Sequence, residues 1–259
     1  MTNNDLPKVL ETAKELAKQA GHIILDIYKK DFFVDYKDDS SPVTEADKKA
    51  NDFIVDKLKN KYPECAILAE ESKDDPARLN NDWCFIVDPL DGTKEFIKKN
   101  DEFTVNIALS YKGKPVMGVI GIPVAKELYF AVKGHGAFFE KGGHVKKIHV
   151  STKTEDIRLM MSRSHKSDKL LQLIEKNRIK DIKSAGSAIK GCLIAKGEAE
   201  VYYRFGYTME WDTAAMQCIV EEAGGILRQM DDSEMTYNRV NNLNDKGFYI
   251  INHPNNKLI

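Results

Sequence analysis

The segment from Asp88 to Thr93 carries the residue types that could assemble a metal–phosphate site. It reads Asp-Pro-Leu-Asp-Gly-Thr and directly follows an apolar run. We expect Pro89 to force a turn that brings Asp91 to the same side as Asp88, and Gly92 to let the backbone approach a ligand closely. Hard cations such as Mg²⁺ bind carboxylate and carbonyl oxygens together with substrate phosphate. A surface turn of the Pro-x-Asp-Gly type is the alternative interpretation.

Two further acidic positions could join this site. Glu70 closes the apolar run 66–69, which we expect to lie beside the run 83–87, so that the acidic ends of both meet. Ligands favour the carboxyl edge of the sheet in α/β folds. Asp212 stands at the start of a predicted helix, where its second carboxylate oxygen could bind a cation. The structural alternatives are a charged strand end that meets solvent for Glu70 and a helix N-cap for Asp212.

Asp47 is expected to work together with Thr93. It lies three residues after Thr44, in the spacing of a capping box, and at the margin of the apolar stripe of the helix that follows. A carboxylate at that margin is partly desolvated and needs a partner, for which the Thr93 hydroxyl is suitable. Thr93 also stands where a short helix could begin, and the free N–H groups of a helix start can bind an anion. Capping alone is the structural alternative for Asp47.

The elements that position these residues follow from the apolar pattern. Apolar residues at three- and four-residue spacing predict a helix over 5–28 and a second one from Thr44 to Tyr62, with a ribbon or loop over 29–41 between them. Apolar runs separated by Gly and Pro then predict a meander, which suggests an antiparallel sheet beside the two helices. After residue 150 strands and helices alternate, as in an α/β fold. The predicted strands are 66–69, 83–87, 103–109, 116–120, 127–132, 159–161, 199–203 and 248–251, and the later helices are 167–177, 187–196 and 213–223.

Composition limits the class of protein. The 259 residues include 39 Lys and Arg against 40 Asp and Glu, and this even balance gives no case for a nucleic-acid partner. No apolar run is long enough to span a bilayer, and the first residues do not resemble a secretion signal. The four cysteines lack the spacing of a zinc or redox site and suit a reducing compartment. We therefore expect a cytoplasmic protein; loose attachment to the inner face of the cell membrane and the oligomeric state stay open.

Taken together, the motifs resemble those of the inositol monophosphatase superfamily of metal-dependent, lithium-sensitive phosphatases. Within it the chain is most similar to the bacterial 3′(2′),5′-bisphosphate nucleotidases, because it reads Asp-Gly-Thr-Lys-Glu-Phe after residue 90 where inositol monophosphatases usually read Asp-Gly-Thr-Thr-Asn-Phe. The resemblance implies a layered α-β-α-β-α sandwich and hydrolysis of adenosine 3′,5′-bisphosphate to AMP and phosphate, a reaction of sulfur assimilation. It rests on the segments Pro42–Asp47, Glu70–Ser72, Asp88–Thr93 and Trp211–Ala215.

The same resemblance implies roles for single residues. Glu70, Asp88 and the backbone carbonyl of Leu90 would hold one Mg²⁺; Asp88, Asp91 and Asp212 would hold a second; Glu70 could help to position a third. Asp47 and Thr93 would orient the attacking water, with Glu70 as a further catalytic residue. We expect a domain over 1–150 that carries most metal ligands and a domain over 151–259 that carries Asp212 and the nucleotide contacts. The expected substrate contacts are Glu70, Leu90, Asp91, Gly92, Thr93, His165, Ser187, Lys190, Arg204 and Asp212.

Substrate specificity depends on the second half of the chain. Lys190 and Arg204 suit the 5′-phosphate of a small nucleotide, since a guanidinium can bind phosphate through two hydrogen bonds. Without the resemblance, they would be a solvated helix lysine and a surface strand arginine. Ser187 lies in Ala-Gly-Ser-Ala, where relatives often read Gly-Ser-Ser. The alternatives are a phosphatase for inositol monophosphate or fructose 1,6-bisphosphate, and a non-catalytic sensor of metal or nucleotide, which would need no water-orienting Asp47–Thr93 pair.

Overall fold

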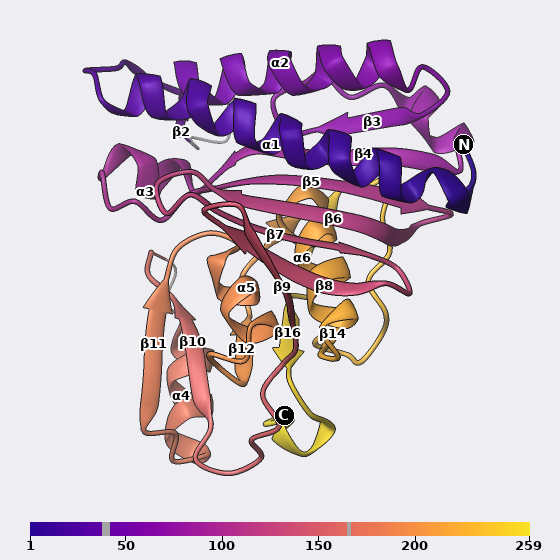
Figure 1. The fold of residues 1–259 in the computed structure, drawn as a ribbon. Coiled ribbons are helices and arrows are strands. Elements are labelled where there is room, and N and C mark those ends of the chain that lie inside the picture. Colours follow the sequence, from indigo (N-terminus) through magenta and orange to yellow (C-terminus); the bar gives the residue numbers. More distant parts are fainter. Residues whose placement is uncertain (38–41, 165–166) are drawn as a thin grey trace.

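The computed structural model describes residues 1–37, 42–164 and 167–259 of the chain. Helices and sheets alternate in five layers (Figure 1). Two long helices cover one face of a seven-stranded sheet, two shorter helices separate it from a five-stranded sheet, and one helix covers the far face of the latter. The predicted α-β-α-β-α sandwich is therefore confirmed.

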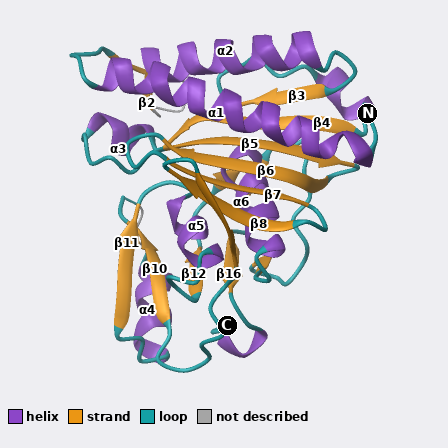
Figure 2. Cartoon of the chain, in the orientation of Figure 1, coloured by secondary structure: helices purple, strands orange, loops and turns teal. Residues whose placement is uncertain are grey.

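The outer helices α1 (Leu6–Tyr28) and α2 (Glu45–Lys61) begin and end within a few residues of the predicted helices. Both bury one apolar stripe against the first sheet, and Figure 2 shows them side by side above it. Between them, β1 (Val34–Tyr36) pairs antiparallel with β2 (Pro42–Thr44), which confirms a ribbon in this part of the predicted segment. The ribbon leads directly into the capping residue Thr44.

The first sheet has the strand order β3-β4-β5-β6-β7-β8-β9. All neighbours pair antiparallel except β3 and β4, which are parallel. The predicted antiparallel meander is confirmed from β4 onward, and the parallel pair brings the carboxyl ends of the predicted strands 66–69 and 83–87 together, as expected. A loop with the short 3₁₀ helix η2 (Pro76–Asn80) carries the chain back between these two strands. The strands are β3 (Ala66–Ala69), β4 (Trp83–Asp91), β5 (Thr104–Tyr111), β6 (Lys114–Ile122), β7 (Glu127–Val132), β8 (Gly136–Lys141) and β9 (His144–Ile148).

Strand β4 extends beyond the predicted strand 83–87. It continues through Pro89 to Asp91, and its pairing with β5 shifts register between Asp88 and Asp91. A proline lacks the N–H that a regular ladder needs, so a bulge is the place where a strand can accommodate it. The bulge, rather than a turn, therefore sets the relative direction of the two aspartates.

The second sheet has the order β11-β10-β12-β16-β14, with parallel pairs around β10 and antiparallel pairs around β16. Strands β11 and β14 and the hairpin β8–β9 escaped the sequence analysis, because β9 and β11 are largely exposed and carry few apolar residues. The elements are β10 (Arg158–Ser162), α4 (Asp168–Lys176), β11 (Asp181–Ala185), α5 (Ile189–Ala195), β12 (Val201–Arg204), β14 (Ile226–Gln229) and β16 (Phe248–Ile251). The ribbon β13 (Thr208–Met209) and β15 (Leu243–Asn244) stands apart from this sheet.

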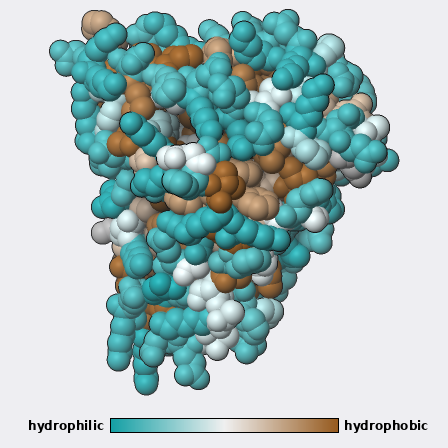
Figure 3. All heavy atoms as spheres, viewed as in Figure 1, coloured by the Kyte–Doolittle hydropathy of each residue, from teal (hydrophilic) through white to brown (hydrophobic). Residues whose placement is uncertain are grey.

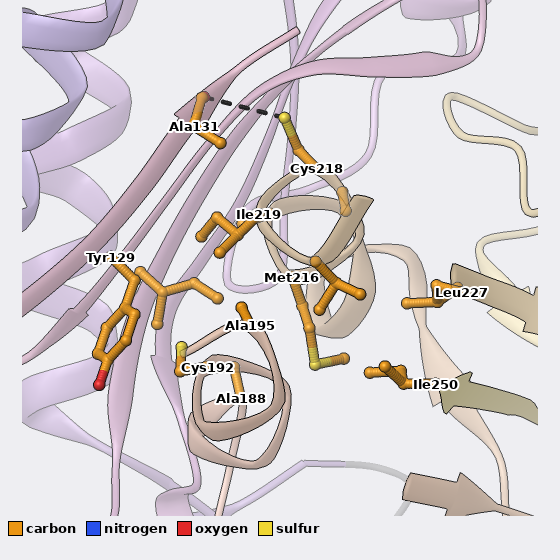
Figure 4. Packing of buried hydrophobic residues seen from close by; sticks show 14 of the residues in the cluster. Tyr129, Ala131, Ala188, Cys192, Ala195, Met216, Cys218, Ile219, Leu227 and Ile250 are labelled. Carbon is orange, nitrogen blue, oxygen red and sulfur yellow. Dashed lines mark hydrogen bonds between the residues drawn. The ribbon is translucent and has the colours of Figure 1, made fainter. Parts of the chain in front are cut away.

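Helix α6 (Glu210–Glu222) is the centre of the sandwich. Figure 4 shows its residues between the first sheet and β14 and β16 of the second. Cys218 Sγ lies 3.8 Å from the carbonyl oxygen of Ala131. Gly118 of β6 permits a very close approach, because a Cβ there would lie 2.5 Å from the carbonyl oxygen of Ala215. Helix α6 thus belongs to the second half of the chain yet packs on the first sheet, and the division at residue 150 stays a prediction.

The surface is mixed in character. On the face that Figure 3 shows, hydrophilic side chains predominate and hydrophobic ones appear in small groups. Among the helices of the described ranges, none is both long and apolar enough to cross a membrane.

Candidate active site

A cleft of about 510 Å³ lies between the carboxyl ends of β3 and β4 in the first sheet and the carboxyl ends of β10 and β12 in the second sheet. It collects most of the residues that the sequence analysis selected from distant parts of the chain. Asp47, Asp88 and Leu90 are buried directly beneath the residues that line it, and His165 lies outside the described residues. The predicted residues that line the cleft are Glu70, Asp91, Gly92, Thr93, Ser187, Lys190, Arg204 and Asp212.

Three aspartates form the tightest acidic group. One carboxylate oxygen from each of Asp88, Asp91 and Asp212 lies within 4.8 Å of the others. The bulge of β4 supplies the first two, and the N-terminal turn of α6 supplies the third. A set of oxygen donors alone is the kind that hard divalent cations such as Mg²⁺ prefer, so these residues fit such an ion.

Each aspartate of this group is also held by the protein. Oδ1 of Asp88 accepts a hydrogen bond from the N–H of Leu90 at 3.0 Å, Oδ2 of Asp91 accepts one from the N–H of Ala188 at 2.7 Å, and Oδ2 of Asp212 accepts one from the N–H of Met209 at 2.6 Å. A carboxylate held through one oxygen can still offer the other to a cation. The backbone therefore orients all three side chains in advance.

Burial and mutual repulsion make the ionised form of these three carboxylates unfavourable in the absence of a cation. Burial, reinforced by the neighbouring carboxylates, raises the pKa of Asp212 to about 8 and the pKa of Asp88 well above its usual value. Burial also raises the pKa of Asp91, although Lys190 works against it. A group of carboxylates that resists ionisation in this way is stabilised by a cation that binds between them.

Glu70 is turned toward a residue that the sequence analysis did not select. Its Oε1 lies 2.9 Å from Nζ of Lys37, which also lies 2.5 Å from Oε1 of Glu71. Burial raises the pKa of Glu70 to about 7, which Lys37 partly opposes. The parallel pairing of β3 and β4 places Glu70 next to the carboxyl end of the predicted strand 83–87, as expected. The N–H of Glu70 donates to the carbonyl of Val87 at 3.1 Å. The roles of Glu70 and of the Leu90 carbonyl as metal ligands stay predictions.

Asp47 and Thr93 make the predicted pair. Oγ1 of Thr93 donates to Oδ1 of Asp47 at 2.9 Å, while Oδ2 of Asp47 accepts from the N–H of Thr44 at 2.7 Å and from its hydroxyl at 2.5 Å. The capping box and the pairing with Thr93 are thus both present, since each uses a different carboxylate oxygen. Burial raises the pKa of Asp47, which these donors partly offset. Gly92, with φ of 98°, supplies the left-handed turn into the helix α3 (Thr93–Ile97) that Thr93 begins.

Asp212 is not the N-cap of its helix. Helix α6 begins two residues earlier, at Glu210, so Met209 is the capping position and Asp212 is the third residue of the first turn. From there its carboxylate reaches back to the N–H of Met209. Helix α6 thus starts earlier in the chain than the predicted helix 213–223. It directly follows β13, whose two residues give no apolar pattern.

The second half of the cleft carries two cationic side chains. Lys190 is buried, not solvated, and its ammonium group donates to the carbonyls of Ser187 and Ala185; burial lowers its pKa to about 8, which Asp91 partly opposes. Arg204 donates to the carbonyl of Tyr207 at 3.2 Å. In the described part of the chain, Arg204 Nε and Ser187 Oγ are buried side-chain atoms without a hydrogen-bond partner. These two atoms are suited to a polar ligand in the cleft.

Comparison with known proteins gives the same assignment. The sequence matches the inositol monophosphatase family over residues 5–252. The chain belongs to this family. It is 42% identical to the 3′(2′),5′-bisphosphate nucleotidase CysQ of Buchnera aphidicola over 95% of both chains, and 40% identical to the protein of that name from Salmonella typhimurium over 93% of this chain and 99% of the other.

Solved structures of the inositol monophosphatase family share the fold. CysQ from Bacteroides thetaiotaomicron superposes with a TM-score of 0.80 at 41% identity, over 92% of this chain and 95% of that one. An inositol monophosphatase from Thermotoga maritima superposes with a TM-score of 0.81 at 27% identity, over 95% and 92% of the two chains.

Proposed function

We propose that this protein hydrolyses adenosine 3′,5′-bisphosphate to AMP and phosphate, with two or three Mg²⁺ ions at the acidic group. The observation that carries the proposal is that the acidic group of Asp88, Asp91 and Asp212 exposes two of its members, Asp91 and Asp212, to the cleft that Lys190 and Arg204 also line. Carboxylates at one end would collect cations around the phosphate that is cleaved. Cationic side chains at the other end would bind the phosphate that remains. The CysQ relatives, which are named bisphosphate nucleotidases, support the same substrate.

The protein's own groups would place the reactants. Bound Mg²⁺ supplies positive charge that stabilises the attacking and leaving oxygens of an in-line displacement. Because Thr93 donates its proton to Asp47, its hydroxyl oxygen is left as an acceptor for the attacking water. The N–H groups of Gly92 and Thr93 would donate to phosphoryl oxygens. Asp47 thereby acts by fixing the direction of the Thr93 hydroxyl.

A substrate panel tests the proposal. Phosphate release with Mg²⁺ should be fastest for adenosine 3′,5′-bisphosphate, slower for inositol monophosphate and fructose 1,6-bisphosphate, and inhibited by Li⁺. Asp88→Asn and Asp212→Asn should each reduce turnover by several orders of magnitude, since each replaces a negatively charged ligand of the ions by a neutral amide. Circular dichroism should show both variants folded. Near-native turnover of either variant would contradict the metal assignment, and equal rates on all three substrates would contradict the nucleotide.

Arg204 should separate nucleotide substrates from simple phosphate esters. Arg204→Ala should raise KM for adenosine 3′,5′-bisphosphate at least tenfold, because a charge-assisted contact to phosphate is lost. KM for inositol monophosphate, which has no second phosphate, should change much less. Steady-state kinetics on both substrates provides the measurement, and an equal rise in both KM values would argue against a role in nucleotide recognition.

A further inference from the structure

A buried network of polar side chains lies behind the N-terminal end of α6. Glu210, the first residue of the helix, is 0% exposed. Its carboxylate accepts hydrogen bonds from the backbone N–H groups of Asn238 at 2.6 Å and Arg239 at 2.9 Å, and from Nε of Arg239 at 3.1 Å. A buried carboxylate with three donors is costly to disturb, because the loss of a donor leaves charge uncompensated. Glu210 therefore fixes the start of α6 to the loop that follows β14.

Hydrogen bonds connect this carboxylate to Asp212. Nη2 of Arg239 donates to Oδ1 of Asn244 at 2.6 Å, and Nδ2 of Asn244 donates to the carbonyl of Met209 at 2.8 Å. The N–H of Met209 in turn donates to Asp212 at 2.6 Å. The carbonyl and the N–H of Met209 belong to the two successive peptide groups that flank its Cα, so Asn244 holds, from the side of Glu210, the residue whose N–H directs Asp212.

The network also reaches the segment that carries Glu70. Arg78 of η2, which is buried, donates to Oδ1 of Asn238 at 2.8 Å, to the carbonyl of Arg239 at 2.9 Å and to Oδ1 of Asn242 at 2.8 Å. This helix lies in the loop that follows β3 and Glu70. Arg78 therefore ties the loop after β3 to the same loop that holds α6.

We propose that the α6 anchor, defined as Arg78, Glu210, Asn238, Arg239 and Asn244, positions Asp212 for cation binding. None of its five members is among the residues that line the cleft, so the α6 anchor acts through the backbone of Met209 and not on the substrate. The inference rests on the metal site of the proposed function. It assigns to these residues a role in metal affinity beyond their contribution to stability.

The test is the affinity of the substrate-free protein for Mn²⁺, measured by electron paramagnetic resonance, together with the free energy of unfolding in urea. The variant is Glu210→Gln, which keeps the size of the side chain but removes its charge and one acceptor. The matched control is Glu200→Gln. Glu200 is also 0% exposed and accepts from the N–H of Arg158 at 2.6 Å and from its Nε at 3.0 Å, and neither residue lines the cleft.

We expect both glutamine variants to lose stability, but only Glu210→Gln to weaken Mn²⁺ binding, by about tenfold, as is typical when a group that orients a metal ligand is lost. Asn238→Gly gives a milder second test, which decides the matter if Glu210→Gln does not fold. It removes the side-chain link to Arg78 at a position with φ of 57°, where glycine is favoured, and should weaken binding in the same direction.

Native affinity in a folded Glu210→Gln and in Asn238→Gly would overturn the role of the α6 anchor, as would an equal loss of affinity in Glu200→Gln. Absence of Mn²⁺ binding by the native protein would be a different result. It would contradict the metal site of the proposed function itself.

Discussion

At the scale of single residues, the site depends on side chains that meet two demands at once. Asp47 accepts a hydrogen bond from the N–H of the α2 N-cap residue Thr44 with one carboxylate oxygen and a hydrogen bond from the Thr93 hydroxyl with the other. Asp212 binds the Met209 peptide and also belongs to the acidic group. Asp47 and Asp212 therefore have a structural and a functional role together. In each, the hydrogen bond from a backbone N–H to one carboxylate oxygen fixes the direction of the other oxygen.

Thr93 offers the sharpest single-residue prediction. Thr93→Val should lower kcat by about two to four orders of magnitude, because it removes the hydroxyl that would orient the attacking water while keeping the shape of the side chain. Thr93→Ser, which restores the hydroxyl, should recover most of the activity. Single-turnover phosphate release provides the measurement. A Val variant that is as fast as the Ser variant would exclude this role.

At the scale of elements, the close packing of α6 on β6 determines where Asp212 lies. Gly118 allows the backbone of the helix to approach the strand, and the aspartate group forms only because the first turn of α6 reaches the bulge of β4. A small change in this contact should therefore affect both stability and catalysis.

Two glycines of β6 provide a matched pair. Gly118→Ala would put a Cβ 2.5 Å from the carbonyl oxygen of Ala215, whereas Gly121→Ala would make only an ordinary contact, 3.5 Å from Cδ1 of Leu128. We expect Gly118→Ala to lower the free energy of unfolding by about 1–3 kcal/mol through overpacking, and to reduce kcat as α6 shifts. Gly121→Ala should leave kcat unchanged. Urea unfolding and phosphate release measure the two effects, and indistinguishable variants would refute the argument.

The elements also show how far sequence analysis reaches. Long helices, buried strands and the capping box at Thr44 have local signals, and these were predicted. The bulge at Pro89 depends on the pairing of β4 with β5, which no local signal gives, so the expected turn was wrong. Lys37 and Glu210 matter only through three-dimensional neighbours and carry no motif. The acidic motifs, by contrast, are short stretches of sequence in which the carboxylates that could bind a cation stand close together, so they can be recognised without the structure.

At the scale of the whole molecule, charge is nearly balanced, yet negative charge is concentrated at one site. The chain has one more acidic than basic residue, while the cleft brings together carboxylates with raised pKa values. Their protonation therefore couples the stability of the entire fold to pH and to metal.

In the absence of metal, stability should fall as pH rises from about 5 to 8. Folded Asp212 has a pKa of about 8 against an ordinary value of 3.8, so in this range the folded state holds a proton that the unfolded state has lost. The free energy of unfolding then decreases with pH and levels off above the folded pKa. Mg²⁺, which binds the ionised form, should stabilise the protein more at pH 8.5 than at pH 5.5.

Urea unfolding across this pH range, with EDTA or with Mg²⁺, provides the measurement, and Asp212→Asn is the control. The variant should show a weaker pH dependence in EDTA and a smaller gain from Mg²⁺. Identical curves for the variant and the native protein would mean that Asp212 does not carry the effect.

The central position of α6 has a consequence for the protein during its synthesis. The last member of the acidic group lies on this helix, far along the chain from the bulge that supplies the other two, and the loop that secures it comes later still. A chain that is still on the ribosome and ends before α6 lacks Asp212, so it cannot complete the acidic group. A cation bound by all three aspartates would thus favour the finished protein over partly folded forms, and its binding during refolding would mark the step at which α6 packs on the first sheet.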